Sequence, residues 1–222
     1  MMKGVLLAAA ILLAASGAQA QWVSGMTSSG SNVVLPDART NLGIKSISIK
    51  DYGAVCDGTS RPLSTIYATL GAAQAVYPTA GALTDELDGM AMNNALEAAR
   101  TAPAFGGQRP AIVIFPQGIC RVNTSINATN LRGSAVELIF TGNFIRSSAA
   151  GKVAFDALGA QRLKITNLTL WGDTGADAPK VGLQVGRTDI AANNQSDSLT
   201  IDRATVFGSF TQAAHQNFAG EQ

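Results

Sequence analysis

The sequence predicts a mainly β fold in which short strands stack as the coils of a solenoid. From Ala111 onward, apolar runs of four to eight residues alternate with Gly, Asn and Asp turns, a pattern typical of short strands. Residues 163–172 and 199–208 share the pattern L-x-I-x-x-L/A-T-L/V-aromatic-G and start 36 positions apart. A fixed-period repeat indicates a solenoid, because one coil cannot bury its inward face alone.

One strand and two helices are expected before the coils begin. Residues 44–49 nearly alternate apolar and polar side chains, as a half-buried strand does. Residues 63–77 have apolar positions at helical spacing and stop at Pro78. A second helix is expected from Asp88, which can cap it. Its apolar stripe at i, i+3, i+4 and i+7 consists of Met92, Ala95, Leu96 and Ala99.

The later strands are read from apolar runs that end at turn residues. The run 111–115 ends at Pro116, and the run 136–140 ends at Thr141 and Gly142. Further strands are expected at 153–158, 163–170, 181–185 and 199–207. Asn167 tolerates the left-handed backbone that a sharp coil corner requires.

The first twenty residues have the composition of a secretory signal peptide. Lys3 precedes the eleven-residue apolar run 5–15, and Ala18-Gln19-Ala20 forms a small-residue cleavage site. Eleven apolar residues are too few for a membrane span, which needs about 20. We therefore expect cleavage after Ala20, a secreted or periplasmic protein, and no membrane span.

These features divide the chain into five expected parts. They are a signal peptide (1–20), a loose lead-in (21–43), an N-terminal strand with helices and the first coil (44–122), further coils (123–212), and a polar C-terminal tail (213–222).

Composition excludes several classes of protein. Sixteen basic and fifteen acidic residues give a formal net charge of +1, with no basic patch for nucleic acid. The chain is 46% hydrophobic and 14% charged, which excludes wholesale disorder. A single His excludes a multi-histidine metal site within one chain.

Two cysteines, Cys56 and Cys120, have two interpretations. In an oxidising compartment such a pair is expected to form a disulfide. Two buried, unpaired thiols are the alternative, because a bridge requires Cα atoms within about 7 Å of each other.

Three segments, in order, resemble the N-terminal region of the pectate-lyase superfamily, in particular rhamnogalacturonase- and epimerase-like proteins. Residues 47–58 (ISIKDYGAVCDG) are similar to its V-K-D-F-G-A-x-G-D-G signature. Residues 88–99 (DGMAMNNALEAA) are similar to its D-T-x-A-I-Q-x-A-L-x-A-A helix. Residues 112–122 (IVIFPQGICRV) are similar to its V-x-F-P-x-G-x-Y-x-V strand. Departures include Cys56 for Gly and an insertion at 59–83. The resemblance implies a right-handed parallel β-helix with an N-terminal capping α-helix, and the stripe on residues 92–99 suits that cap.

The resemblance also implies polysaccharide as the partner. Members of this family cleave polysaccharides with paired aspartates or by calcium-assisted β-elimination, so Ca²⁺ enters by resemblance alone. The candidate catalytic residues are Asp173 and Asp177 in a turn and Asp202 on the repeated strand. The alternative is that they form turns and a solvated strand face. Asp85, Glu86 and Asp88 fit a helix start, where acids favour the dipole.

Two aromatic residues share one repeat position. Trp171 and Phe207 either stack on sugar rings or pack between adjacent coils.

Three functions remain open. The chain is a lyase or glycosidase of acidic glycans, a non-catalytic module that binds glycan or self-associates through the open end of the β-helix, or a truncated inactive relic. About 100 residues follow Val122, enough for about four coils. This length favours the second and third functions over catalysis.

Overall fold

The computed structural model describes residues 44–101, 111–131, 135–186 and 199–218. The predicted signal peptide and lead-in, and the localisation inferred from them, lie outside the described residues. Within the described ranges, no helix has both the length and the apolar character that a membrane crossing demands.

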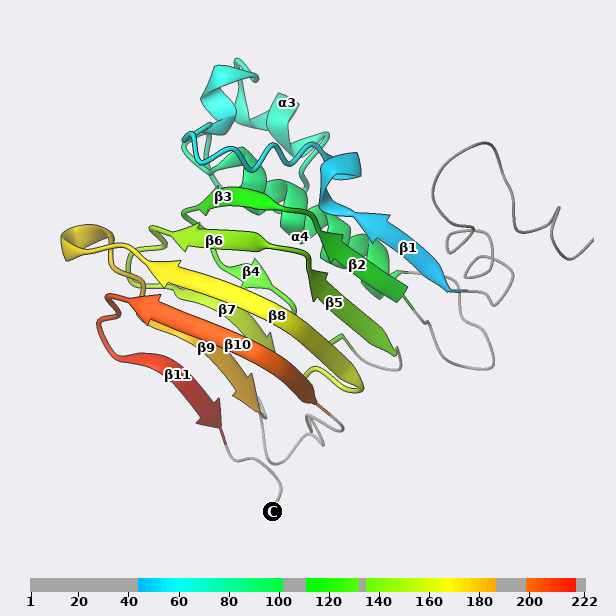
Figure 1. The fold of residues 1–222 in the computed structure, drawn as a ribbon. Coiled ribbons are helices and arrows are strands. Elements are labelled where there is room, and N and C mark those ends of the chain that lie inside the picture. Colours follow the sequence, from blue (N-terminus) through cyan, green and yellow to red (C-terminus); the bar gives the residue numbers. More distant parts are fainter. Residues whose placement is uncertain (1–43, 102–110, 132–134, 187–198, 219–222) are drawn as a thin grey trace, which may run out of the picture. The chain divides into compact units, whose positions relative to one another are not determined.

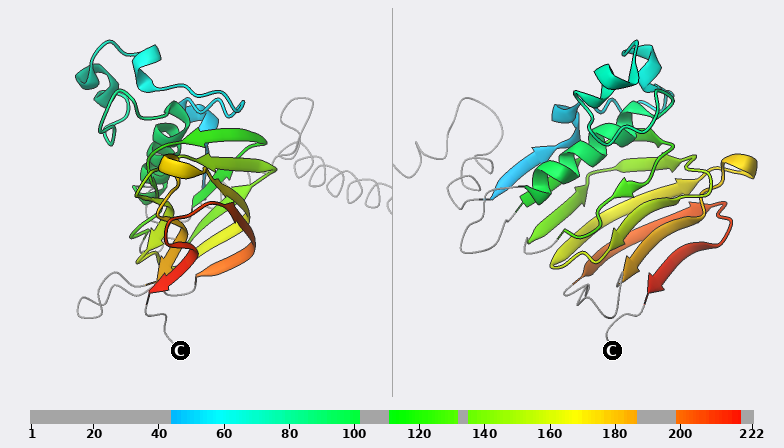
Figure 2. Two further views of the ribbon diagram at one scale, coloured as in Figure 1. Left: turned by 90° about the vertical axis from the view of Figure 1, so that its left-hand side faces the viewer. Right: turned by 180° about the vertical axis from the view of Figure 1, so that it is seen from behind.

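The chain forms a parallel β-solenoid, which confirms the predicted fold class (Figure 1). Two sheets line its sides, and every pair of neighbouring strands in them runs parallel. Sheet 1 contains β1 (Lys45–Ser48), β2 (Ala111–Phe115), β3 (Gly118–Val122), β5 (Val136–Phe140), β6 (Asn143–Ser147), β8 (Leu163–Gly172) and β10 (Thr200–Gly208). Sheet 2 contains β4 (Ile126–Asn127), β7 (Val153–Leu158), β9 (Val181–Gly186) and β11 (Ala213–Phe218). Figure 2 shows both sheets from two further directions.

Each coil passes through sheet 1 and then through sheet 2. The successive coils are β2–β3–β4, β5–β6–β7, β8–β9 and β10–β11. In the first two coils the sheet 1 strand is interrupted by a turn, whereas β8 and β10 run through the same bend without a break. Asn167 in β8 and Arg203 in β10 have φ of 60° and 57° there. The expectation that Asn167 takes a left-handed conformation is confirmed.

The predicted internal repeat corresponds to two neighbouring coils. Thr200 lies opposite Lys164, and Gly208 lies opposite Gly172, so β10 follows β8 in the register of the sequence pattern. Phe207 therefore lies beside Trp171.

The core consists of inward-facing apolar side chains stacked from coil to coil. The Phe115 and Phe140 rings stack with their centroids 4.1 Å apart, and Phe155 of sheet 2 meets Phe140 edge-on. All three are fully buried. Burial of each phenylalanine stabilises the fold by about 1.5–3 kcal/mol.

Helix α4 (Leu87–Arg100) covers the first coil and packs against β1, β2, β3 and β4 (Figure 2). The predicted stripe of Met92, Ala95, Leu96 and Ala99 is confirmed, since all four side chains are fully buried. Three short 3-10 helices are described as well: η1 (Ile49–Tyr52), η2 (Leu63–Thr65) and η3 (Gly175–Asp177).

Asp88 does not cap α4. The helix begins one residue earlier, and its N-cap is Glu86. The Asp88 carboxylate instead accepts hydrogen bonds from three backbone N–H groups that α4 does not contain, as described below. Because its carboxylate binds these distant N–H groups, Asp88 does not cap the helix, and Glu86 takes the N-cap position.

The predicted helix over 63–77 is broken. Only η2 and α3 (Leu70–Gln74) form there. The Leu63 and Ser64 N–H groups donate to the Asp85 and Leu83 carbonyls, which ties the start of this segment to residues 83–85. Ile66, one of the apolar positions at helical spacing in this segment, is 55% exposed.

Part of the predicted polar tail is a strand. Residues 213–218 form β11, which pairs with β9. A parallel ladder uses backbone groups, so the polar side chains of this segment do not prevent pairing.

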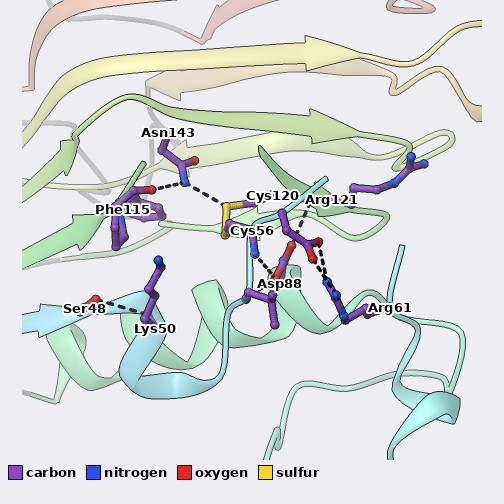
Figure 3. Close-up of a disulfide and its surroundings, with 12 residues drawn as sticks. Ser48, Lys50, Cys56, Arg61, Asp88, Phe115, Cys120, Arg121 and Asn143 are labelled. Atoms are coloured by element: carbon purple, nitrogen blue, oxygen red, sulfur yellow. Dashed lines mark hydrogen bonds and ion pairs between the residues drawn. A yellow bond between two sulfur atoms is a disulfide. The ribbon is translucent and has the colours of Figure 1, made fainter. Parts of the chain in front are cut away.

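The turn after η1 (residues 53–58) is tied to α4 and to the first coil by a disulfide and one carboxylate (Figure 3). Cys56 and Cys120 are joined, and both are buried. Asp88 accepts hydrogen bonds from Val55 N (2.8 Å), Cys56 N (3.1 Å) and Arg121 N (3.2 Å). Asp88 thereby links the cap helix, the turn and β3.

Removal of the disulfide should lower stability strongly. The bridge joins residues separated by 64 positions, and the loop-closure model assigns about 4 kcal/mol to a loop of this size. We expect the Cys56→Ala/Cys120→Ala variant to lose about that much unfolding free energy in urea, and reductant to affect only the wild type. Equal stability of the oxidised wild type and the double variant would contradict this account.

Asp88 should make stability depend on pH. Burial raises the pKa of Asp88 above its ordinary value of 3.8, outweighing the three N–H donors that lower it. The folded chain then holds this proton at a pH where the unfolded chain has lost it. The resulting stabilisation is complete below the unfolded pKa and is lost as the pH rises through the folded pKa. We expect Asp88→Asn to lack this component in urea unfolding series, while the exposed Asp51→Asn control retains it.

Candidate functional site

The outward face of sheet 1 carries one row of large side chains in register across four coils. Arg121 of β3 lies opposite Arg146 of β6, Arg146 lies opposite Trp171 of β8, and Trp171 lies opposite Phe207 of β10. We call these four residues the outward row. Neighbouring strands are about 4.8 Å apart, so the row extends for about 14 Å along the solenoid.

Aromatic rings form one half of the outward row. The Trp171 and Phe207 rings are stacked, with centroids 5.6 Å apart and planes 26° apart. Phe144 of β6 meets both rings, with its centroid 5.7 Å from that of Trp171 and 5.6 Å from that of Phe207. Trp171 remains 36% exposed and Phe207 40% exposed. The rings thus pack between coils, as one of the two interpretations of their repeat position expects, and still present apolar surface.

Arginines form the other half. The Arg146 guanidinium lies 5.4 Å from the centre of the Trp171 ring, within the range of a cation–π interaction. Its Nε donates to Asp173 Oδ1 at 2.8 Å, and Arg121 Nη2 lies 3.9 Å from Asp173 Oδ2. Two guanidinium groups share one carboxylate, so this cluster carries one net positive charge beside the exposed rings.

The glycine that ends each repeat permits this close stacking. A Cβ on Gly208 would lie 2.3 Å from the Gly172 carbonyl oxygen and 2.3 Å from Trp171 Cδ1. Gly208 also has a φ of 98°, in a region that L side chains rarely adopt. A side chain at this position would displace the Trp171 ring.

The three predicted catalytic acids occupy different surroundings. Asp173 follows β8 and is held by the two arginines. Asp177 is exposed in η3. Asp202 lies on β10 opposite Thr166, 3.8 Å from Arg203 Nε.

Asp173 and Asp202 are not brought together. The β8–β10 register places Asp202 beside Thr166, seven positions before Asp173 on the neighbouring strand. Seven residues of strand span about 23 Å. Glycoside hydrolysis by paired carboxylates needs a separation of about 5–9.5 Å, which this pair does not meet.

Asp85 and Glu86, the two acids just before α4, bind backbone N–H groups of the inserted segment. Asp85 Oδ2 accepts hydrogen bonds from Gly81 N (2.7 Å) and Ala82 N (3.0 Å). Glu86 accepts from Arg61 N at 2.7 Å and also bonds the Ser60 hydroxyl. These contacts fix the inserted segment to the start of the helix.

Among the described residues, one group of three His, Cys, Asp or Glu side chains lies close enough together to share a metal ion. It consists of Cys56, Asp88 and Cys120, and the two sulfurs are bonded to each other. Asp173, Asp177 and Asp202 do not belong to such a group. The structure therefore gives no support to a calcium site at Asp173, Asp177 or Asp202.

Sequence reasoning missed Phe144, Arg146 and Arg121. The segment Asn143–Ser147 alternates buried and half-buried side chains in the structure, but its sequence N-F-I-R-S does not alternate apolar and polar residues and so carries no period-two signal. Its central Phe-Ile-Arg is short, and the turn at Gly142 separates it from β5. Recognition of this segment as a strand would have placed Phe144 and Arg146 on one face.

No family model and no curated protein matches the sequence. Among solved structures, the tailspike protein gp49 from Pseudomonas phage LKA1 is 34% identical over 54% of this chain and 17% of its own, with a TM-score of 0.37. The Pseudomonas phage phi297 tailspike gp61 is 14% identical over 78% of this chain and 49% of its own, with a TM-score of 0.42. The chain thus spans about a sixth of the first structure and about half of the second.

Proposed function

We propose that this chain binds polysaccharide along the outward row of sheet 1. The observation that carries the proposal is the exposed, stacked pair of Trp171 and Phe207, with Arg146 against the tryptophan ring. Stacked rings held by a rigid sheet offer a fixed apolar surface at little entropic cost, which suits the C–H faces of sugar rings. Arginine N–H groups beside these rings supply donors for hydroxyl and carboxylate oxygens.

We propose an acidic polysaccharide over a neutral one. The two positive charges of Arg121 and Arg146 exceed the one negative charge of Asp173 by one. The two arginine side chains remain 25% and 39% exposed. A carboxylate on the glycan would meet these groups at the edge of the aromatic surface. Salt should weaken this attraction, because partly exposed charges are screened.

The relationship to the pectate-lyase superfamily is part of the proposal. The three resembling segments correspond to the β1–η1 turn, to α4, and to β2 with β3 of the first coil. Export through the predicted signal peptide would bring the chain to extracellular glycans.

We propose binding without cleavage. Asp173 is occupied by two arginines, and Asp202 lies about 23 Å from it along the strands. Asp173 and Asp202 therefore do not form the acid pair of a glycosidase, and the Asp173 carboxylate beside the rings is held by arginines and is not a free base.

Substitutions in the outward row test the location of the binding site and the effect of charge separately. We expect Trp171→Ala to weaken polygalacturonate binding about 10-fold in affinity gel electrophoresis, a change of about 1.4 kcal/mol. Asp173→Asn should strengthen binding, because it removes the negative charge beside the arginines. The exposed Ile66→Ala, outside the row, is the matched control and should leave affinity unchanged.

The same samples test catalysis and ligand charge. We expect dextran to bind more weakly than polygalacturonate, and neither polymer to yield unsaturated products or new reducing ends. Unchanged affinity in Trp171→Ala would overturn the binding site. Product formation that Asp173→Asn abolishes would show that the chain is an enzyme.

We also propose self-association through the open face of β10. Ile201 is 36% exposed, whereas Ile165, its register partner in β8, is fully buried. Leu183, Ala204 and Val206 line a hollow at this face with it. Helix α4 covers the first coil, so two copies would meet β10 to β10 around a two-fold axis, which closes the assembly at a dimer.

Light scattering after size-exclusion chromatography measures this state directly. We expect a concentration-dependent dimer that Ile201→Lys converts to monomer, with Val55→Lys, also at an exposed apolar position, as control. A monomer at all concentrations, or a filament, would contradict the proposal.

A further inference from the structure

A pair of apolar side chains lies beside the outward row on the same face of sheet 1. Ile119 of β3 lies opposite Phe144 of β6. Each comes two residues before an arginine of the outward row, Arg121 or Arg146, so the four side chains share one face. Two residues of strand span about 6.6 Å, which separates the pair from the row. We call Ile119 and Phe144 the flanking pair.

The flanking pair is open to solvent at Ile119. This side chain is 45% exposed, more than Trp171 or Phe207. The turn after η1 ends beside it, since Asp57 pairs with Ile119 in parallel and the Gly58 N–H donates to the Ile119 carbonyl at 2.7 Å. A Cβ on Gly58 would lie 3.6 Å from Ile119 Cβ, so a side chain at this position would cover part of the isoleucine. The glycine therefore keeps the apolar surface accessible.

Two sets of charges border the flanking pair. On one side, the Asp57 carboxylate is held by Arg61, with Oδ1 2.6 Å from Nη1 and Oδ2 2.7 Å from Nη2, so these two charges cancel. On the other side, Arg121 and Arg146 share the single carboxylate of Asp173 and leave one positive charge. A ligand on this face would therefore meet a guanidinium group and an exposed aliphatic side chain about 6.6 Å apart.

The side chain of Ile119 favours a methyl group over a hydroxyl group. It has no hydrogen-bonding atom, so a sugar hydroxyl placed against it would lose water without a replacement partner. A methyl group placed there would bury apolar surface. The Phe144 ring contacts both Trp171 and Phe207, so the apolar surface continues from the flanking pair to the stacked rings. A substituent on a sugar at Trp171 would thus have an apolar surface beside it.

We propose that the flanking pair selects acidic polysaccharides whose sugars carry O-acetyl groups, with the acetyl methyl against Ile119 and Phe144. This inference rests on the proposed binding of polysaccharide along the outward row and adds a substituent to it. An acetyl ester on a hydroxyl adds a methyl group and leaves the carboxylate free for the arginines, whereas a methyl ester of the carboxylate would remove that charge. Burial of one methyl group increases affinity about fourfold.

Affinity gel electrophoresis of the full chain tests the proposal with chemically O-acetylated polygalacturonate and with the same sample after mild alkali has removed the acetyl groups. We expect the wild type to bind the acetylated polymer about fourfold more tightly. Ile119→Ser should bind both polymers as the wild type binds the deacetylated one. Trp171→Ala should weaken binding of both, because the ring contact does not depend on the acetyl group.

Two further variants assign the preference to Ile119. Ile66→Ser makes the same change at an exposed isoleucine outside the row and should keep the preference. Ile119→Gln keeps the length of the side chain, should abolish the preference, and serves if Ile119→Ser lowers the melting temperature. The inference alone is overturned if the wild type binds both polymers equally or the deacetylated one more tightly, or if a stably folded Ile119 variant keeps the preference. Absence of binding to either polymer would overturn the proposed function together with this inference.

Discussion

Parallel stacking in register determines both the interior and the surface of this chain. Neighbouring strands of sheet 1 lie about 4.8 Å apart, so each position of one coil meets the corresponding position of the next. On the inside this ladder stacks Phe115 on Phe140. On the outside it aligns Arg146, Trp171 and Phe207. A shift of one residue would exchange inward and outward faces, so the outward row exists only in the register that builds the core.

The first coil of the solenoid needs a cover, and helix α4 provides it. Without α4, the first coil would expose backbone groups and apolar side chains. The Cys56–Cys120 disulfide and the Asp88 carboxylate hold the turn after η1 and helix α4 against β3. The same turn carries Asp57 and Gly58, which lie beside Ile119 of the flanking pair. The contacts that close the core therefore also border the outward face of sheet 1.

Features with strong periodicity could be predicted from the sequence, and features that depend on distant partners could not. Strands β2, β5 and β7 have the predicted bounds because apolar runs end there at turn residues. The pairing of β8 with β10 followed from their shared pattern. β11 was missed because backbone pairing with β9 imposes no apolar pattern. The arginines around Asp173 were missed because they lie 27 and 52 positions away and become neighbours only through coil stacking.

We propose that polysaccharide lies against Trp171, and tryptophan fluorescence reports on this contact directly. The chain has two tryptophans, Trp22 and Trp171, so Trp22→Phe leaves Trp171 as the sole indole. During titration with polygalacturonate, we predict that Trp171 emission shifts to the blue and that acrylamide quenches it less. Unchanged emission and quenching at polymer concentrations that retard the protein in affinity gels would contradict the claim, because binding would then occur elsewhere.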